Sequence, residues 1–243
     1  MSDALYLADV AHAAPGDRIV LDGPEGRHAV QVKRTRAGES LLLADGSGNA
    51  VRGKVVSLEG PTLVLEVAEV LVTPDRPHRF VAAQALAKGD RSERAIEALT
   101  ELGVDEVIAW QASRSIVRWH ADKAAKGLDK WRSTVREATK QSRRFRVPEV
   151  TTASTTQLVG RLAQADAAFV LHEDATLDLA DATLPSSGEV LVVIGPEGGI
   201  SPEELAAFEG AGATSVSISD GVLRTSTAGV VALARLLVMG RQA

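Results

Sequence analysis

Three glycines and two prolines follow a buried apolar run in the segment VLVVIGPEGGISPEE, residues 190–204. The run 190–194 is β-branched and apolar, as expected of a strand that is covered on both faces. Gly195, Gly198 and Gly199 allow positive φ angles and a close approach of the backbone to another group, and Pro196 fixes one φ angle. Such a loop presents backbone amides at the carboxyl end of a strand, where open α/β sheets bind their ligands.

The residues after this loop predict the start of a helix, because Ser201 is a good N-cap, Pro202 suits the first helical position and Glu204 completes a capping box. The loop is not G-x-G-x-x-G and lacks the Lys-Ser/Thr of a P-loop, which disfavours a dinucleotide or triphosphate site. Taken alone, it is also explained by a plain strand-to-helix turn. A second glycine-containing loop, ISDGVLRTSTAG at 218–229, follows the next predicted strand. Two such loops at the ends of neighbouring strands predict a site for a small ligand.

Positive charge is concentrated in one segment of an acidic chain. The net charge is −5, yet the segment 114–146 holds eleven Lys and Arg residues against three acidic ones. Arg132, Arg136, Lys140 and Arg143 follow one another at helical spacing and are expected on one face of a helix near 128–142. A basic patch on an acidic protein favours binding to a phosphate backbone. The alternative is a solvated helix face followed by a charged linker.

The amino-acid composition excludes several kinds of site and of protein. The chain has 243 residues, 24% of them charged, and no cysteine, which excludes disulfides, thiolate metal sites and cysteine nucleophiles. The five histidines have no ligand spacing, so we expect no metal site. No apolar run is long enough to span a bilayer, and the N-terminus lacks the pattern of a signal peptide, so we expect no membrane partner and a cytoplasmic location.

Residues 1–72 are expected to form a small all-β barrel, with strands at 18–21, 29–32, 41–43, 51–58 and 63–70. Between the first two of these strands, Gly-Pro-Glu-Gly at 23–26 is expected to be a turn. Two prolines in 73–77 predict a linker, so that residues 73–243 form a second domain.

Strands and helices alternate in this second domain, which predicts an α/β fold with a mainly parallel sheet. We expect strands at 80–87, 104–110, 167–171, 190–194 and 215–219. Helices are expected after Asp90 as N-cap, near 128–142, at 201–211 and near 226–239, with Gly103 ending the first of them. The last helix is apolar nearly all round, which indicates either a homodimer interface or burial within one chain.

Several short motifs, in order along nearly the whole chain, resemble one enzyme family. They are KGDR at 88–91 with TELGV at 100–104, SRS at 113–115, EAxxQ at 137–141, LHE at 171–173, GPEGG at 195–199, LRTxTA at 223–228 and, nearer the N-terminus, HxxxVKR at 28–34 with the Asp45-Gly turn. Together these motifs resemble the RsmE-type 16S ribosomal RNA (uracil-N3)-methyltransferases of the SPOUT superfamily. The resemblance implies a PUA-like β-barrel, a SPOUT-type domain with a trefoil knot, an obligate dimer and S-adenosylmethionine as cofactor.

The resemblance also implies site residues. Three loops would surround the cofactor, with contacts from Leu171, His172, Glu173, Gly195, Pro196, Glu197, Gly198, Gly199, Ile218, Ser219, Gly221, Leu223, Arg224, Thr227 and Ala228. Glu173 would hold a ribose hydroxyl or the cationic methionine end, unless it is a solvated loop carboxylate. Arg224 is the expected catalytic residue, stabilising negative charge on the uracil ring or gripping a phosphate, and its alternative is a salt bridge at a helix N-terminus. Glu197 is a weak candidate for a general base.

Two family features are absent from this sequence. Ser226 stands where the family usually has glutamate in its LRTETA motif, and residues 218–222 lack the usual Gly-Pro-Arg. Any family role of that carboxylate or that arginine therefore does not carry over to this chain.

The expected RNA contacts come from basic residues and one glutamine: Lys33, Arg34, Lys88, Arg91, Arg114, Arg132, Arg136, Lys140, Gln141, Arg143 and Arg144. Phosphate contacts of this kind give affinity without sequence information. The favoured function is therefore methylation of uracil N3 in 16S rRNA of the small ribosomal subunit. A non-catalytic RNA-binding or ribosome-assembly factor, and the same fold acting on another RNA such as tRNA, are the alternatives.

Overall fold

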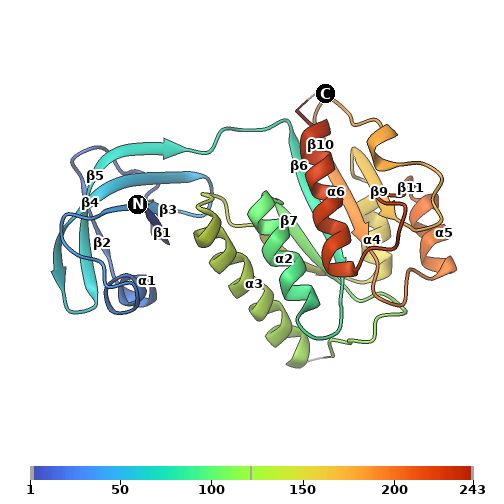
Figure 1. Ribbon diagram of the computed structural model, residues 1–243, viewed down its shortest axis with the longest axis horizontal. Helices are drawn as coiled ribbons and strands as arrows, with labels where there is room; N and C mark the ends of the chain where they lie inside the picture. The colour runs from blue at the N-terminus through green and yellow to red at the C-terminus, as the bar shows by residue number, and fades with distance from the viewer. Residues whose placement is uncertain (1–2, 121, 242–243) are drawn as a thin grey trace. The chain divides into compact units, whose positions relative to one another are not determined.

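The computed structural model describes residues 3–120 and 122–241 and divides the chain into two compact units (Figure 1). Unit 1 comprises Met1–Asp75 and Glu137–Val147, and unit 2 comprises Arg76–Arg136 and Pro148–Ala243. Among the helices described, none is long and apolar enough to cross a membrane.

Unit 1 is built on a five-stranded mixed sheet in the order β1-β3-β4-β5-β2, in which β1 and β3 are parallel and the other pairs are antiparallel. Its elements are β1 (Ala4–Leu7), β2 (Arg18–Leu21), α1 (Gly23–Arg27), η1 (His28–Val32), β3 (Ser40–Ala44), β4 (Asn49–Glu59) and β5 (Thr62–Val72). The expected barrel takes the form of this sheet, whose end strands β1 and β2 are not paired with each other. Its core is mostly aliphatic, with Leu43, Leu63 and Leu65 fully buried beside Tyr6.

The predicted turn at 23–26 and the predicted strand at 29–32 were wrong, since both segments are helical. Pro24 lies in the first turn of α1, and the chain continues directly into the single π-helical turn η1. Of the five η1 residues, only Ala29 is fully buried. The apolar–polar alternation of Ala-Val-Gln-Val therefore did not mark a strand, because only one of its residues faces the core. A Cβ on Gly26 would lie 2.5 Å from the Leu21 carbonyl oxygen, so the close fit of α1 under the sheet requires glycine there. Strand β1 was not predicted.

Unit 2 has a six-stranded, all-parallel sheet in the order β11-β9-β10-β6-β7-β8. Its strands are β6 (His78–Ala85), β7 (Glu106–Trp110), β8 (Glu149–Ala153), β9 (Ala167–Leu171), β10 (Gly188–Ile194) and β11 (Thr214–Val216). Its helices are α2 (Arg91–Leu102), α4 (Thr155–Leu162), the short 3₁₀ turn η2 (Leu179–Asp181), α5 (Pro202–Gly210) and α6 (Thr225–Met239), with α3 (Asp122–Ser142) running from unit 2 into residues of unit 1. The predicted parallel α/β domain is confirmed.

Helices cover both faces of this sheet. Helices α2 and α6 pack against each other and against β6, and lie on the same side of the sheet (Figure 1). The alternate strand residues form a second apolar layer with α4 and α5, in which Trp110 and Phe208 meet edge to face at 5.3 Å between ring centroids. Because both faces are covered, β6 and β10 are almost continuously buried, as their apolar sequences predicted.

The helix ends agree only in part with the sequence prediction. Gly103 ends α2 with φ +97°, and Ser201 and Glu204 form the predicted capping box of α5. Asp90 lies at the predicted N-cap position of α2, but the expected capping bond is not made, because its side chain pairs with Arg94 at 2.8 Å instead. Helix α3 starts at residue 122, well before the predicted residue 128, and β8 and α4 were not predicted.

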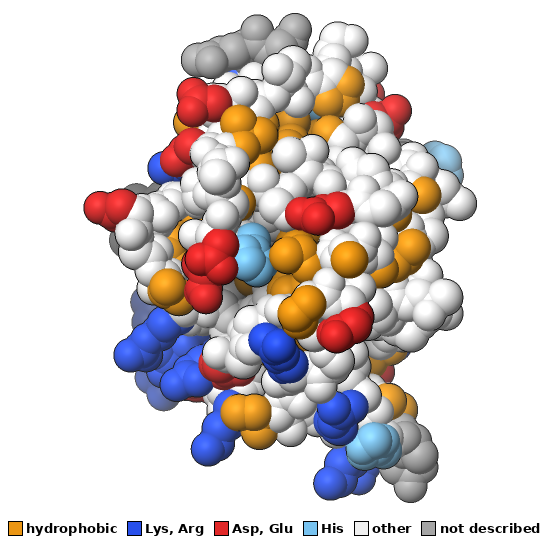
Figure 2. Space-filling view, turned by 90° about the vertical axis from the view of Figure 1, so that its right-hand side faces the viewer, with side chains coloured by type: hydrophobic (Ala, Val, Ile, Leu, Met, Phe, Trp, Pro, Cys, Tyr) orange, Lys and Arg blue, Asp and Glu red, His pale blue; other side chains and the backbone are white. Residues whose placement is uncertain are grey.

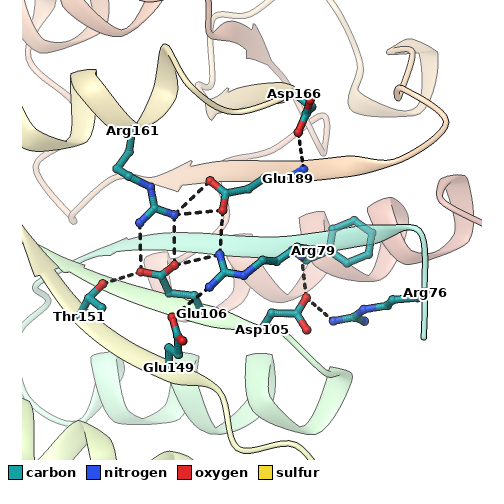
Figure 3. Close-up of polar contacts among 10 residues, drawn as sticks. Arg76, Arg79, Asp105, Glu106, Glu149, Thr151, Arg161, Asp166 and Glu189 are labelled. Carbon is teal, nitrogen blue, oxygen red and sulfur yellow. Dashed lines mark hydrogen bonds and ion pairs between the residues drawn. The ribbon is translucent and has the colours of Figure 1, made fainter. Parts of the chain in front are cut away.

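The amino ends of four strands are tied together by a polar network (Figure 3). Glu106 at the start of β7 is 1% exposed and accepts hydrogen bonds from Arg79 on β6, Arg161 on α4 and Thr151 on β8. Both arginines also reach Glu189 on β10. Burial acts to raise the pKa of Glu106, but the bonds from Arg161, Thr151 and Arg79 outweigh it and the pKa is lowered. The network therefore holds an ionised carboxylate at the amino-terminal ends of the strands. The cavity described next lies at their carboxyl-terminal ends.

Candidate cofactor site

A cavity of about 800 Å³ in unit 2 lies at the carboxyl ends of β9, β10 and β11. Three loops surround it, as expected for a parallel α/β sheet. Its lining comprises Arg91, Arg114, Leu171, His172, Glu173, Asp174, Ile194, Gly195, Pro196, Glu197, Gly198, Gly199, Ile200, Pro202, Leu205, Val216, Ser217, Ile218, Ser219, Gly221, Val222, Leu223, Arg224, Thr225 and Ala228. Fourteen of the fifteen residues expected to contact the cofactor are in this lining. The exception is Thr227, whose side chain is exposed in the first turn of α6.

The loop after β10 is a tight turn that leads into α5. The Gly199 N–H donates to the Pro196 carbonyl at 2.9 Å, and Gly199 has φ +73°, which favours glycine. A Cβ on Gly198 would lie 3.1 Å from the Arg114 carbonyl oxygen, so the loop after β7 packs directly on the glycine loop. The glycines are therefore required by turn geometry and by a close backbone approach, and they also line the cavity.

The loop before α6 is fixed by Thr225, which the sequence analysis missed. The Thr225 hydroxyl donates to the Gly195 carbonyl at 2.7 Å and accepts from Gln84 Nε2 at 2.8 Å. Gln84 is fully buried in β6, and its Oε1 has no partner among the described residues. The sequence signals for this chain of hydrogen bonds were a glutamine within the apolar run of β6 and a threonine inside the LRTxTA motif. The bonds join β6 to two of the three loops.

The loop after β9 carries His172 and two carboxylates. The Asp174 N–H donates to His172 Nδ1 at 3.2 Å, and the His172 N–H donates to the Val216 carbonyl at 3.0 Å. These bonds give His172 a structural role in holding the loop after β9. Glu173 and Asp174 are exposed at the rim of the cavity, where they add negative charge.

Glu197 is engaged by the strand–helix corner at 88–91. Its Oε1 accepts from Arg91 Nη1 at 2.7 Å and from the Lys88 N–H at 3.1 Å. Burial acts to raise the pKa of Glu197, but these bonds outweigh it and the pKa is lowered. A carboxylate with a lowered pKa is a poor proton acceptor near neutral pH, so the geometry argues against Glu197 as a general base.

Arg224 lies at the N-cap position of α6 with an exposed side chain. Within 3–120 and 122–241, no hydrogen bond or ion pair holds its guanidinium. The salt bridge considered for Arg224 is therefore not found, and the side chain lies at the cavity with its donors available. Ser226, which replaces the family glutamate, is half-buried in the first turn of α6.

Most of the residues expected to contact RNA are exposed to solvent. Lys33, Arg34, Lys88, Arg114, Arg132, Arg136, Gln141 and Arg143 are exposed, whereas Arg91 and Arg144 are half-buried. Figure 2 shows one face of the molecule on which Lys and Arg side chains gather in the lower part, below a mixture of acidic and hydrophobic ones. Positive charge is thus more frequent in one part of this face than in the rest of it.

Two members of this set do not lie as expected. The Lys140 side chain is 8% exposed, and its Nζ bonds Glu137 at 2.7 Å and Glu25 at 3.1 Å. Its ammonium is thus already neutralised by two carboxylates, which removes the reason to expect a phosphate contact. Arg143 follows the end of α3 with φ +54°, so it does not share a helix face with Arg132 and Arg136. The described residues contain no group of three His, Cys, Asp or Glu residues that could hold a metal ion.

Both units match known RNA methyltransferase domains. Residues 74–237 match the family described as RNA methyltransferase domain, and residues 21–68 match the RNA methyltransferase PUA domain. The chain is 45% identical over 226 residues to ribosomal RNA small subunit methyltransferase E of Mycobacterium bovis, a match that covers 90% of this chain and 86% of that one. It belongs to this methyltransferase E (RsmE) family.

Solved structures agree with this assignment. Ribosomal RNA small subunit methyltransferase E from Neisseria gonorrhoeae, bound to S-adenosyl methionine, superposes with a TM-score of 0.85 at 26% identity over 98% of both chains. A Legionella pneumophila protein in complex with the cofactor SAM gives a TM-score of 0.86 at 28% identity, again over 98% of both chains. The fold of both units is therefore that of RsmE structures.

Proposed function

We propose that this protein transfers a methyl group from S-adenosylmethionine to N3 of one uracil in 16S rRNA of the small ribosomal subunit. The observation that carries the proposal is the cavity formed by three loops in a chain that belongs to the RsmE family. The base, N3 and the position in the rRNA come from the family resemblance. The cavity itself supports a small-molecule cofactor.

The cavity fits S-adenosylmethionine in size and chemistry. Its volume of about 800 Å³ is within the range of small-molecule sites. Ile194, Leu205 and Ile218 offer apolar surface for the faces of an adenine ring, and the glycine loop offers backbone groups for its edge. Glu173 and Asp174 at the rim suit an ammonium or a ribose hydroxyl. The bound cofactor would supply the methyl group from its sulfonium.

The chain must then place N3 in line with that methyl group and stabilise the base as its N3 proton leaves. The negative charge spreads onto the ring carbonyl oxygens, and Arg224 is the unpaired guanidinium at the cavity that would meet it. Glu197 would hold the 88–91 corner through Arg91 and would not accept the proton. We assign no other general base, and the proton would pass to water.

RNA would be held by the exposed basic residues of both units, with residues 1–72 acting as an RNA-binding domain and 73–243 as the methyltransferase domain. Lys33 and Arg34 are exposed in unit 1, and Arg114, Arg132 and Arg136 in unit 2. These contacts would position the rRNA through its phosphates, and the target base would be splayed out to reach the cavity.

Three further features belong to this proposal. The chain would act as a homodimer, because α6 is apolar nearly all round and leaves Val238 56% exposed. The loops around the cofactor would form the trefoil knot that the family resemblance implies. A 16S rRNA substrate would place the enzyme in the cytoplasm.

The experiment is methyl transfer from labelled S-adenosylmethionine to small ribosomal subunits that lack the modification, followed by nucleoside mass analysis. We expect 3-methyluridine from the wild-type protein. Arg224→Ala should lower the rate about a hundredfold to a thousandfold, as for the loss of one group that stabilises an oxyanion, with cofactor affinity little changed.

Other outcomes select the alternatives. Cofactor binding without transfer to the subunit, but with transfer to tRNA or another RNA, would assign the fold a different substrate. RNA binding without cofactor binding would indicate a non-catalytic assembly factor. In that case Ser226→Glu, which restores the family residue, is the first variant to examine.

A further inference from the structure

The Glu204 side chain does more than cap α5. It is 6% exposed, and four donors surround its carboxylate. Oε1 accepts from the Ser113 N–H at 2.8 Å and from the Thr155 hydroxyl at 3.1 Å. Oε2 accepts from the Ser113 hydroxyl at 2.9 Å and from the Ser201 N–H at 3.3 Å. The one side chain therefore joins the start of α5 to the loop after β7 and to α4.

These bonds require a carboxylate. Each oxygen accepts one backbone N–H, from Ser113 on Oε1 and from Ser201 on Oε2. Glutamine also completes a capping box, but its amide has only one acceptor oxygen. In a Glu204→Gln variant, one of the two backbone N–H groups must face the NH₂ group. Capping of α5 would be possible with glutamine at position 204. The bonds to Ser113 are what requires glutamate there.

The Ser113 anchor fixes Arg114 against the glycine loop. The Arg114 carbonyl oxygen and Cβ would lie 3.1 and 3.2 Å from a Cβ at Gly198, so the two backbones are in close contact. Arg114 Nη1 reaches the Gly198 carbonyl at 3.5 Å, and the exposed side chain lines the cavity. The same loop is closed at its base, where the Trp119 N–H donates to Gln111 Oε1 at 2.7 Å and Arg118 donates to the Ser113 carbonyl at 2.8 Å.

We propose that Glu204 is a positioning residue that couples the cofactor loop to Arg114, so that bound cofactor strengthens the grip of Arg114 on RNA. A ligand that orders Gly195–Gly199 and the start of α5 would also order Ser113 through Glu204, and Arg114 follows in the chain. Two ligands that favour the same loop arrangement bind with positive coupling, and the coupling is reciprocal. The inference rests on the proposed function, because it takes S-adenosylmethionine and RNA as the two ligands.

The test measures affinity for small-subunit rRNA with and without saturating S-adenosylhomocysteine, the unreactive product of the cofactor. Ser113→Ala removes one bond to Glu204 and leaves the α5 cap intact, and Glu204→Gln removes a backbone acceptor. Thr155→Ala is the comparison variant, because it removes a donor to the same carboxylate from α4 and keeps both Ser113 bonds, although it also removes the acceptor of the Trp110 Nε1–H at 3.1 Å. Hydrogen exchange of the 113–118 amides provides a readout that is independent of activity.

We expect the product to tighten RNA binding by the wild type about fivefold or more, within the usual range of coupling between sites, and to slow exchange at 113–118. In Ser113→Ala and Glu204→Gln, the product should change RNA affinity by less than about twofold. In Thr155→Ala it should tighten RNA binding as much as in the wild type. If Glu204→Gln does not fold, Ser113→Ala decides.

A wild type that methylates rRNA without any coupling would overturn the inference and leave the proposed function standing. Equal loss of coupling in Thr155→Ala would also overturn it, because Glu204 would then act only through general stability. Coupling without methyl transfer would support the positioning role and count against the proposed function.

Discussion

The Thr225 hydroxyl offers a direct test of how the cavity is held together. Thr225→Val keeps the shape of the side chain but removes both hydrogen bonds of the hydroxyl, the 2.7 Å bond to the Gly195 carbonyl and the 2.8 Å bond from Gln84. Gln84 is fully buried, so its amide is left with only a 3.3 Å contact to the Ala85 carbonyl. One buried donor without a good partner costs about 1 to 3 kcal/mol. With the orphaned carbonyl included, we expect a loss of about 2 to 4 kcal/mol in the free energy of unfolding.

A substitution of Gln84, the hydrogen-bond partner of Thr225, should cost less stability than Thr225→Val. Gln84→Met removes a buried amide whose Oε1 has no partner in the described part of the chain, so its cost should be below about 1 kcal/mol. Adding Gln84→Met to Thr225→Val eliminates the orphaned amide, so the double variant should be about 1 to 2 kcal/mol more stable than Thr225→Val alone.

Urea unfolding followed by tryptophan fluorescence is the appropriate assay, because all three tryptophans, Trp110, Trp119 and Trp131, belong to unit 2. The signal therefore reports the unit that contains the cavity. Binding of S-adenosylhomocysteine should weaken in Thr225→Val, because the Gly195 carbonyl is no longer held. A Thr225→Val loss below about 0.5 kcal/mol, or a double variant no more stable than Thr225→Val, would refute the reasoning.

Three further predictions concern charge and packing. Since the pKa of Glu106 is lowered from its ordinary value of 4.5, its contribution to stability is present above pH 4.5 and is lost as the pH falls through the lowered value. Glu106→Gln should flatten the acid limb of a stability profile measured by tryptophan fluorescence, and an unchanged limb would count against this role. Arg132→Ala should reduce the slope of log affinity for RNA against log salt concentration by about one, whereas Lys140→Met should leave the slope unchanged and lower only stability. The prediction fails if the two variants change the slope equally. Gly198→Ala should cost about 1 to 3 kcal/mol and weaken cofactor binding, because its Cβ would meet Arg114 at 3.1 Å. Gly160→Ala in α4, which meets nothing within 4 Å, is the control and should be neutral or slightly stabilising.

Local signals were sufficient where one residue decides one conformation. The capping box of α5 and the left-handed Gly103 were predicted because each depends on residues within a few positions in the chain. Strands β6 and β10 were predicted because burial on both faces leaves a continuous apolar run. In contrast, Ala29–Val32 alternates like a strand but is a helical turn, because a single inward residue cannot distinguish the two periods.

The contacts between distant segments were not predictable in this way. Glu204 was recognised as a cap, but nothing local indicates that Ser113, 91 positions away in the chain, donates to the same carboxylate. The burial of Lys140 was equally hidden, because its partner Glu25 is 115 positions away. The sequence thus led to a prediction of which residues carry chemistry, and the fold decided which of these residues already have partners.

Unit 1 is made of two separate segments of the chain, which affects how the protein can be divided into fragments. Its second segment, 137–147, is bonded into the first, with the Val147 N–H donating to the Gly46 carbonyl at 2.8 Å and Arg146 donating to the Ser47 carbonyl at 2.9 Å. An expression product that stops at residue 72 would lack this segment and would leave the Gly46–Gly48 turn without its partners. A soluble isolated RNA-binding fragment would therefore require residues 137–147 to be supplied, through a redesigned connection or as a second polypeptide. Proteolytic nicking between the units would yield pieces that remain associated.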